Sequence, residues 1–460
     1  LAAFSLTGCS DDDDDDTSIT DPGGGTMAML RVVHASPDAP GVDIYVNGDT
    51  QPVVVNLAYG GASGYLDVPA GEYTVQIRAH GADASSAPAF ETALSLDDGD
   101  KVTALAAGFL GSADDADRFR VLPLAEDFQS LGAGNVAVRI VHASPDAPAV
   151  ALDVANDGAP EVLDFARFAD TGAAGVALPA GTAINIGVWA GEPLARASVF
   201  TTPELPSGAN LFVIATGRLA GDPMGDGFSL LAIGPDGAIG FIRQDAPAMV
   251  YALHGSPDAP AVDIDAMGGQ VVGDLSFGEL SGGLSLLPGS YDLDFRAAGA
   301  MDVAASVSTP YLQPGMSYLA IATGFLGDTP GFQLIPVADE FDGMADDALV
   351  RVVHASPDAP AVDVGPVSDD KITAIADYSG LAFGQSSVSA GTALPIGPLT
   401  VGVAAAGTED AVATFDLVTA DGLRAFAVAC GSLGGMGEGF RLVLVIPDDG
   451  MWTAAEVLPN

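Results

Sequence analysis

The segment His-Ala-Ser-Pro-Asp-Ala-Pro begins at His34, His142 and His354, and once more at His254 with Gly255 in place of the first alanine. Successive copies lie 108, 112 and 100 residues apart. Solenoid repeats have periods of roughly 20 to 50 residues, so this period is that of a whole domain. The spacing therefore predicts four tandem domains, each with a fold that about 100 residues can form.

The similarity between copies continues beyond this motif. The turn Pro69-Ala70-Gly71 recurs at 179–181 and, in shorter or looser form, at Pro288-Gly289 and Pro395-Ile396-Gly397. Each copy contains about eight short runs rich in β-branched and aromatic residues, separated by Gly, Pro, Asn and Asp turn signals. We therefore predict an all-β chain of four tandem antiparallel β-sandwich domains, immunoglobulin-like, after a disordered tether.

The boundaries follow from this pattern. We expect residues 1–9 to be the remnant of a lipoprotein signal peptide and residues 10–26 to be an acidic, disordered tether. The tether contains Asp11 to Asp16, whose charges repel one another and which cannot bury apolar area. The four β-sandwich repeats are predicted at 27–130, 131–246, 247–345 and 346–460.

The first residues resemble the end of a bacterial lipoprotein signal peptide. Leu6-Thr7-Gly8-Cys9 is similar to a lipobox, in which the cysteine receives the lipid, and Ser10 resembles the outer-membrane sorting pattern. No run of 18 or more apolar residues occurs that would form a spanning helix. We expect lipid attachment at Cys9 and an extracytoplasmic location at the outer membrane or cell surface.

The charge restricts the partners. Fifteen Lys and Arg against 61 Asp and Glu give a net charge of -46, which repels nucleic acid. We expect the chain to contact the membrane through its lipid anchor, and to bind an extracellular protein or a polysaccharide.

The motif itself admits a structural and a chemical interpretation. On a strand of period two, His34 shares the apolar face of Leu30 and Val32. The two prolines end the strand, and Asp38 between them can accept backbone N–H bonds. We therefore predict that the motif ties a tight corner in each domain. Its residues are His34, Ser36, Pro37, Asp38, His142, Ser144, Pro145, Asp146, His254, Ser256, Pro257, Asp258, His354, Ser356, Pro357 and Asp358.

The chemical alternatives are a hydrolytic triad and a metal site. Ser, His and Asp lie within five residues interrupted by Pro37, whereas triad members come from separate elements, and no G-x-S-x-G elbow occurs. Zinc needs three or four ligands, but His80 is the single histidine outside the motif. We therefore predict no enzyme activity, no catalytic residue, no cofactor and no metal.

Calcium is the metal that the sequence permits best. Carboxylates near the motif could combine with loop carbonyls, although Met267 fails a ligand position in the partial calcium loop that starts at Asp263, and Ala151 replaces the acid of the second copy. The candidate calcium ligands are Asp38, Asp43, Asp258, Asp263, Asp265, Asp358 and Asp363.

Three other residues have structural interpretations. Cys430 aligns with Ala107, Thr216 and Thr323, which predicts a small buried filler. Trp189 and Trp452 do not occupy a repeated position, and the strand-like surroundings of Trp189 predict packing in a core or at an edge.

The stretch Arg351 to Val364, which contains the motif at His354, resembles the signature of a bacterial extracellular domain of unknown function, family 4397. The resemblance implies secreted or lipid-anchored tandem β domains and brings no catalytic residues. Gly255 and Ala151 then suggest drift of the second and third copies. We expect a non-enzymatic cell-surface lipoprotein for adhesion, ligand binding or envelope structure. The alternatives are a calcium-rigidified adhesin, and a hydrolase or metal-dependent enzyme hidden in one domain.

Overall fold

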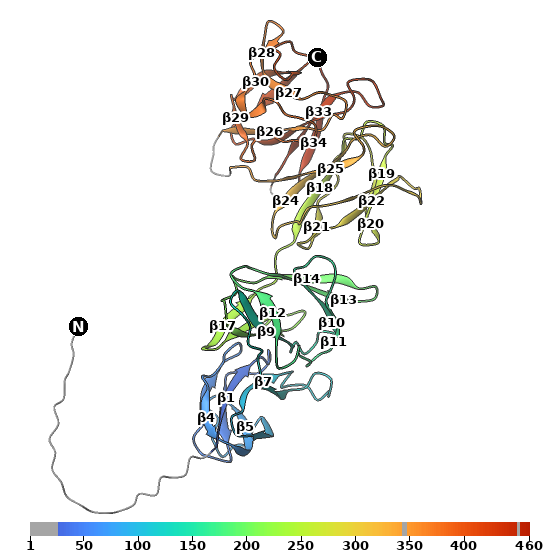
Figure 1. The fold of residues 1–460 in the computed structure, drawn as a ribbon. Helices are drawn as coiled ribbons and strands as arrows, with labels where there is room; N and C mark the ends of the chain where they lie inside the picture. The colour runs from blue at the N-terminus through green and yellow to red at the C-terminus, as the bar shows by residue number, and fades with distance from the viewer. Residues whose placement is uncertain (1–25, 343–346, 449–450) are drawn as a thin grey trace, which may run out of the picture. The chain divides into compact units, whose positions relative to one another are not determined.

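A computed structural model describes residues 26–342, 347–448 and 451–460. The predicted lipid-attachment site Cys9, the signal-peptide remnant and nearly all of the tether lie outside these residues. In the described ranges the secondary structure consists of strands β1 to β34 and one 3-10 helix, η1 (Figure 1). None of the described segments is a helix long and apolar enough to cross a membrane. The prediction of an all-β chain of tandem sandwiches is confirmed.

We call the strands of each predicted repeat a module. Module 1 holds β1 to β8, at Met27–His34, Val42–Val46, Val54–Leu57, Leu66–Pro69, Gly71–Ala79, Phe90–Leu96, Lys101–Ala107 and Arg120–Ala125. Module 2 holds β9 to β17, at Asn135–His142, Val150–Val154, Val162–Phe165, Val176–Pro179, Asn185–Ala190, Ala195–Thr201, Asn210–Thr216, Ser229–Gly234 and Gly237–Ile242.

Module 3 holds β18 to β25, at Ala248–His254, Val262–Ala266, Gly269–Leu275, Leu284–Leu286, Asp292–Ala297, Val303–Ser308, Ser317–Thr323 and Gln333–Ala338. Module 4 holds β26 to β34, at Ala348–His354, Val362–Ser368, Lys371–Ile372, Thr392–Leu394, Gly397–Ala405, Ala413–Thr419, Arg424–Cys430, Arg441–Ile446 and Thr453–Val457, with η1 at Ala376–Tyr378.

The chain divides into two compact units. Unit 1 comprises Leu1–Ala147, Ala166–Gly181 and Leu205–Ile242, and unit 2 comprises Pro148–Phe165, Thr182–Glu204 and Arg243–Asn460. Module 1 therefore lies in unit 1, and modules 3 and 4 lie in unit 2. The two sheets of module 2 belong to different units, with β9, β12, β15, β16 and β17 in unit 1 and the others in unit 2.

Each module has two sheets with a common strand order. In module 1 the orders are β4-β1-β7-β8 and β3-β2-β5-β6. The motif strand β1 pairs antiparallel with β4 but parallel with β7, where His34 lies opposite Ala106. The same parallel pair recurs as β9 with β15, β18 with β24, and β26 with β32. Among the named strands, the predicted antiparallel pairing thus has one exception per module, which the five intervening strands make possible because parallel strands need a long connection.

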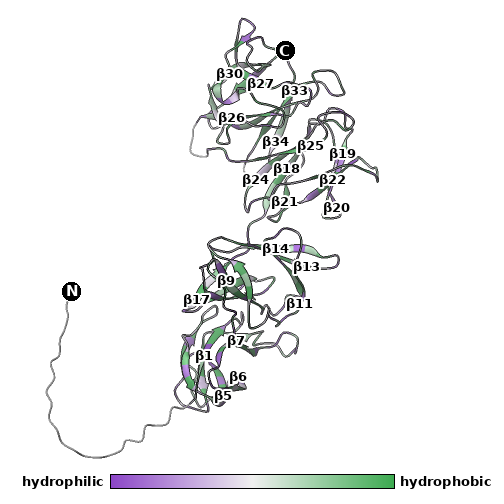
Figure 2. Ribbon diagram, viewed as in Figure 1, coloured by the Kyte–Doolittle hydropathy of each residue, from purple (hydrophilic) through white to green (hydrophobic). Residues whose placement is uncertain are grey.

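The motif strands bury both faces. Leu30 and Val32 of β1 belong to the core of module 1, as the period of two predicts. Val33 and Ala35 point to the other face and are also fully buried, because the β1 sheet packs on the β9 sheet within unit 1. In unit 2 the β18 sheet packs on the β26 sheet in the same way. Figure 2 shows the resulting hydrophobic character of strands such as β18 and β24.

The packed sheets join the modules in two pairs, 1 with 2 and 3 with 4. Modules 2 and 4 each have a fifth strand in the sheet that contains the motif strand. These additional strands are β17 and β34, which pair with β16 and β33. The corresponding strands of modules 1 and 3, β8 and β25, are sheet edges and carry Pro123 and Pro336 at the same position. Proline has no N–H to donate, so it protects an uncovered edge from further pairing.

Candidate functional site

The repeated corner joins the end of the first strand to the loop after the seventh. In module 1, Ser36 is fully buried and its hydroxyl donates to the carbonyl of Gly108, 2.6 Å away. Asp38 accepts the backbone N–H groups of Leu110 at 2.7 Å and Gly111 at 2.9 Å. The motif thus fixes a loop that is more than 70 residues away in the sequence.

The same contacts of the motif serine and aspartate with this loop, which we call the latch, occur in the other modules. The serine hydroxyl donates to Gly217, Gly324 and Gly431 in modules 2, 3 and 4, over 2.6 to 2.8 Å. The aspartates Asp146, Asp258 and Asp358 accept the N–H groups of Leu219, Leu326 and Leu433. The leucine and glycine positions of this loop were not recognised as motif partners from the sequence, although Gly-x-Leu recurs in every copy.

Glycine is required where the latch closes. Gly108 has φ +90, and a Cβ atom there would overlap the carbonyl oxygen of Arg118. Gly217, Gly324 and Gly431 have nearly the same φ and the same conflict with the opposing backbone. Residues with a side chain rarely adopt this backbone conformation. The four glycines therefore allow the loop backbone to fold closely on itself beside the serine.

The motif histidines are interior groups. His34, His142, His254 and His354 are all at most 1% exposed. In His34, Nδ1 accepts the N–H of Ser36 at 3.3 Å, so Nε2 carries the proton and donates to the carbonyl of Pro40 at 3.1 Å. Burial lowers the pKa of His34, against opposing effects of the Pro40 carbonyl and Asp38. With Nδ1 as an acceptor, the His34 imidazole is neutral and both of its nitrogens are engaged.

An aromatic ring accompanies the histidine. The His34 ring lies 6.2 Å from that of Tyr59 in an edge-to-face arrangement, and His254 and His354 meet Phe277 and Phe383 at 6.1 and 6.2 Å in the same way. One signal for this contact is present in the sequence, since an aromatic residue recurs 23 to 29 residues after each histidine. We did not identify it as a partner, because side-chain contacts across a module are not encoded in local periodicity.

The calcium candidates are occupied by hydrogen bonds and ion pairs of the protein. Asp43 accepts the N–H groups of Asn56 and Gly81 and contacts His80 Nδ1 at 2.9 Å. Burial raises the pKa of this carboxyl, but these hydrogen bonds outweigh it and the pKa falls below its ordinary value. Asp38 is held by the loop at 110–111, so Asp38 and Asp43 are tied to different loops.

The remaining candidates are arranged similarly. The Asp263 carboxylate accepts the backbone N–H groups of Asp274 and Gly299. The Asp363 carboxylate accepts the backbone N–H groups of Gly380 and Gly407. Asp265 pairs with Arg296 at 2.6 Å. Asp258 and Asp358 hold the latch loops. Within the described ranges, no group of three or more His, Cys, Asp or Glu side chains is placed to hold a metal ion.

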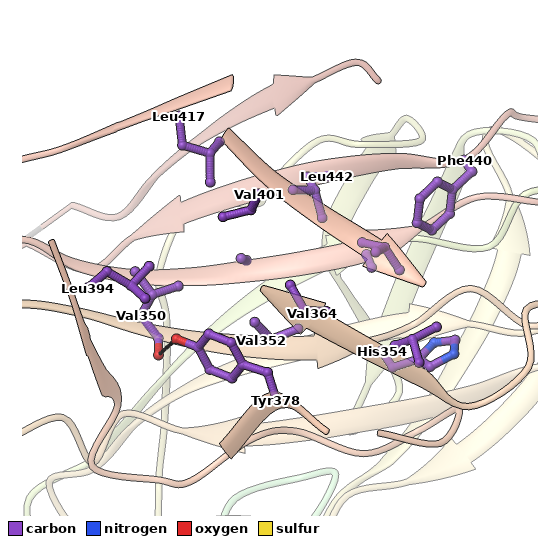
Figure 3. Close-up of a pocket in the computed structure, with 14 residues that line it drawn as sticks. Val350, Val352, His354, Val364, Tyr378, Leu394, Val401, Leu417, Phe440 and Leu442 are labelled. Atoms are coloured by element: carbon purple, nitrogen blue, oxygen red, sulfur yellow. Dashed lines mark hydrogen bonds between the residues drawn. The ribbon is translucent and has the colours of Figure 1, made fainter. Parts of the chain in front are cut away.

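The enclosed space beside a motif histidine is a packing gap of the sandwich. In module 4 it measures about 30 Å³ and lies among Val350, Val352, Leu394, Phe440 and the His354 ring (Figure 3). The hydroxyl of Tyr378, which also lines it, donates to the carbonyl of Val350. Ligand pockets are typically about 300 to 1,000 Å³. The space beside His354 is too small and too apolar for substrate chemistry.

The face opposite the histidines joins two modules. Arg31 is 1% exposed and donates to the carbonyl of Gly234 in module 2. The equivalent residue of module 2, Arg139, donates to the carbonyl of Ala125 in module 1. Thr216 donates to the carbonyl of Ala35 in the motif of module 1. Because the motif strand carries both the latch and this contact, each corner also supports the pairing of modules.

In unit 2 the corresponding contacts link modules 3 and 4. Thr323 donates to Ala355, and Arg351 donates to Ala338. Trp452 is buried here, stacked on Tyr251 at 4.5 Å. Trp189 lies in another place, on β13, where its indole donates to Asp153 and Arg196 lies over its ring.

Gly255, the one departure from the motif sequence, lies close to Cys430 of module 4. A Cβ atom there would lie 3.4 Å from the Cβ of Cys430, the filler residue of module 4. Cys430 is fully buried, and burial raises the pKa of its thiol to about 12. The 3.4 Å distance is an ordinary van der Waals contact, so the packing at Gly255 does not itself require glycine and gives no structural reason for the change.

A family model described as Domain of unknown function (DUF4397) matches residues 28–155 and 248–365, more than half of the chain. The chain belongs to this family. Each matched DUF4397 region begins at the motif strand of the first module of a pair and includes the motif strand of the next. The matches therefore recur once per pair of modules. The fifth strands, β17 and β34, also occur once per pair.

Other comparisons add little to the DUF4397 assignment. No curated protein matches the chain significantly. Among solved structures, one titled "The Bacillus anthracis TIE protein" is similar at 12% identity over 67% of this chain and 51% of that chain, with a TM-score of 0.15. The chain thus spans about half the length of that structure, and we base no argument on the likeness.

Proposed function

We propose that this DUF4397 protein is a non-enzymatic cell-surface lipoprotein whose β-sandwich modules present binding surfaces for an extracellular protein or polysaccharide. The observation that supports this proposal is the use of the repeated polar residues. In every module the motif serine and aspartate are bonded to the module's own loop, and the histidine is buried. A nucleophile needs an accessible oxygen, whereas the Ser36 hydroxyl is buried and donates its hydrogen bond to the Gly108 carbonyl.

The pairing of modules supports the same role. Two sheets that bury their outer faces against each other form a larger rigid body than a single sandwich, and rigidity reduces the entropy lost when a surface binds a partner. Loops that differ between modules are free to vary, because the latch fixes only their first residues. Binding therefore belongs to the surface of a pair rather than to the motif.

Lipid anchoring is tested by replacing Cys9. Cells expressing the complete precursor and cells expressing Cys9→Ser are labelled with radioactive palmitate, fractionated, and treated intact with protease. We expect the parent chain to carry label, to sediment with the envelope and to be cleaved on intact cells. A Thr17→Ala variant, changed in the tether, serves as a control that retains both Cys9 and Ser10. Identical labelling and fractionation of parent and Cys9→Ser would contradict the anchoring.

A further inference from the structure

Strand β20 in module 3 presents its edge to an open groove. The strand ends its sheet, whose order is β20-β19-β22-β23. Five consecutive residues, 271 to 275, line the groove. The side chains of Val272 and Leu275 belong to the core of module 3, so these two residues line the groove with their backbone. The pairing with β19 is irregular at this point, and the N–H of Asp274 donates to Asp263. No strand of the described chain pairs with this edge.

The groove has the size and lining of a binding site. It measures about 770 Å³, within the range of roughly 300 to 1,000 Å³ that is usual for ligand sites. Opposite β20, the wall is strand β34 of module 4, through Ala454 and Glu456. Gly282 and Gly283 also line the groove, and at Gly282 a Cβ would meet no atom within 4 Å. Both modules belong to unit 2.

The charge of the groove is acidic. Asp274, Glu279 and Glu456 line it, and the one cation bonded to any of them is Arg441, which donates to Glu456 at 3.0 Å, among the described residues. Carboxylates bind cationic side chains through charge-assisted hydrogen bonds. Lysine or arginine side chains on a strand that bound in this groove would therefore strengthen its binding.

The equivalent position in unit 1 is filled. Phe241 on β17 corresponds to Glu456 on β34, because they face Leu231 and Val443 at matching places in the neighbouring strands. Phe241 packs on Gly60 and lies 5.3 Å from the Tyr59 ring. In module 4 the carboxylate of Glu456 lies against Gly278 instead. The two module pairs thus differ at one position that decides whether the space holds an aromatic ring.

We infer that the β20 edge, opposite Glu456, is a docking site for an extended basic segment of another polypeptide, which adds to the sheet as a further strand. An exposed edge supplies unpaired N–H and C=O groups for this mode of binding, and alternate side chains of the added strand contact the surrounding walls. The inference rests on the proposed binding role but not on lipid anchoring, so its test uses the purified chain.

The probe is a ten-residue peptide of alternating lysine and valine, with both ends blocked. Binding is measured by fluorescence anisotropy at about 150 mM salt, where long-range attraction to the acidic chain is screened. Hydrogen exchange then reports whether the β20 amides gain protection. A peptide of identical charge with alternate backbone nitrogens methylated cannot form the strand ladder. A neutral dextran oligosaccharide tests the carbohydrate alternative.

Two variants close the groove. Glu456→Phe copies the residue found at Phe241, and Gly282→Lys adds a charge at a site where a Cβ meets no atom within 4 Å. Gly64→Lys is the matched control, since it also has open space and lies outside the groove. We expect both groove variants to weaken peptide binding at least about 10-fold and the control to change it less than about 2-fold.

The expected result is peptide binding with protection of β20, lost on methylation. Equal binding of the methylated peptide, protection elsewhere than β20, no binding at millimolar peptide, or binding of the oligosaccharide in place of the peptide would each overturn the inference. None of these results would bear on attachment through Cys9.

Discussion

Replacing Ser36 by alanine removes a hydroxyl that bonds Gly108 and also contacts Asp38 at 3.2 Å, and it leaves the other residues of the motif in place. The hydroxyl is fully buried and donates to Gly108 over 2.6 Å. Removing the donor leaves the Gly108 carbonyl without this partner, which costs about 1–3 kcal/mol. For a cooperative unit of about 200 residues, such as a packed pair of modules, each kcal/mol lowers Tm by about 2–4 °C.

Calorimetry of the complete chain measures this effect, with hydrogen exchange to assign the shifted transition to module 1. The control is Ser95→Ala, since Ser95 is exposed on β6. We predict a lower transition and faster exchange in β7 and the loop after it for Ser36→Ala, and the parent melt for the control. If Ser36→Ala melted like the parent, the structural role of the serine would be refuted.

The remaining predictions concern the same corner. Gly108→Ala places a Cβ against the Arg118 carbonyl at φ +90, and we expect it to destabilise by more than about 3 kcal/mol in urea titration, with an equal melt of parent and variant as the contrary result. The pKa of His34, His254 and His354 is lowered by burial. The unfolded chain therefore binds more protons below about pH 6.5, so the free energy of unfolding should fall as pH drops below that value and stay level above it, as far as these groups determine it. A free energy that rises on acidification from pH 7 to 5.5 would disagree. Because the candidate carboxylates are bonded to the protein, millimolar calcium and a chelator should give the same melt, and a calcium-dependent rise in Tm would restore the calcium-rigidified adhesin.

The sequence predicted the fold class, the repeat and the phase of the motif strand. Leu30, Val32 and His34 face the core because alternation in a strand is local and survives any tertiary arrangement. The role of Asp38 as an acceptor of backbone N–H groups also followed from its position between two prolines. These features depend on neighbouring residues alone.

Other features depend on partners distant in the sequence. The burial of Val33 and Ala35 results from another sheet, and alternation cannot say what covers the second face. A signal was nonetheless present, since Val33 and Ala35 make the strand apolar on both sides, as in fully buried strands. Pro123 and Pro336 likewise lie on the edge strands that have no fifth strand beside them. This signal is visible when modules 1 and 3 are compared with modules 2 and 4.

The central claim is that the motif is a structural corner in every module, and the accessibility of its histidines tests this most directly. Diethyl pyrocarbonate modifies accessible imidazoles, and peptide mapping by mass spectrometry assigns each modified residue. His80 has a side chain that is 47% exposed, while the four motif histidines are at most 1% exposed. We predict modification of His80 in the folded chain and of all five histidines in urea. Rapid modification of His34, His142, His254 or His354 in the folded chain would contradict the account.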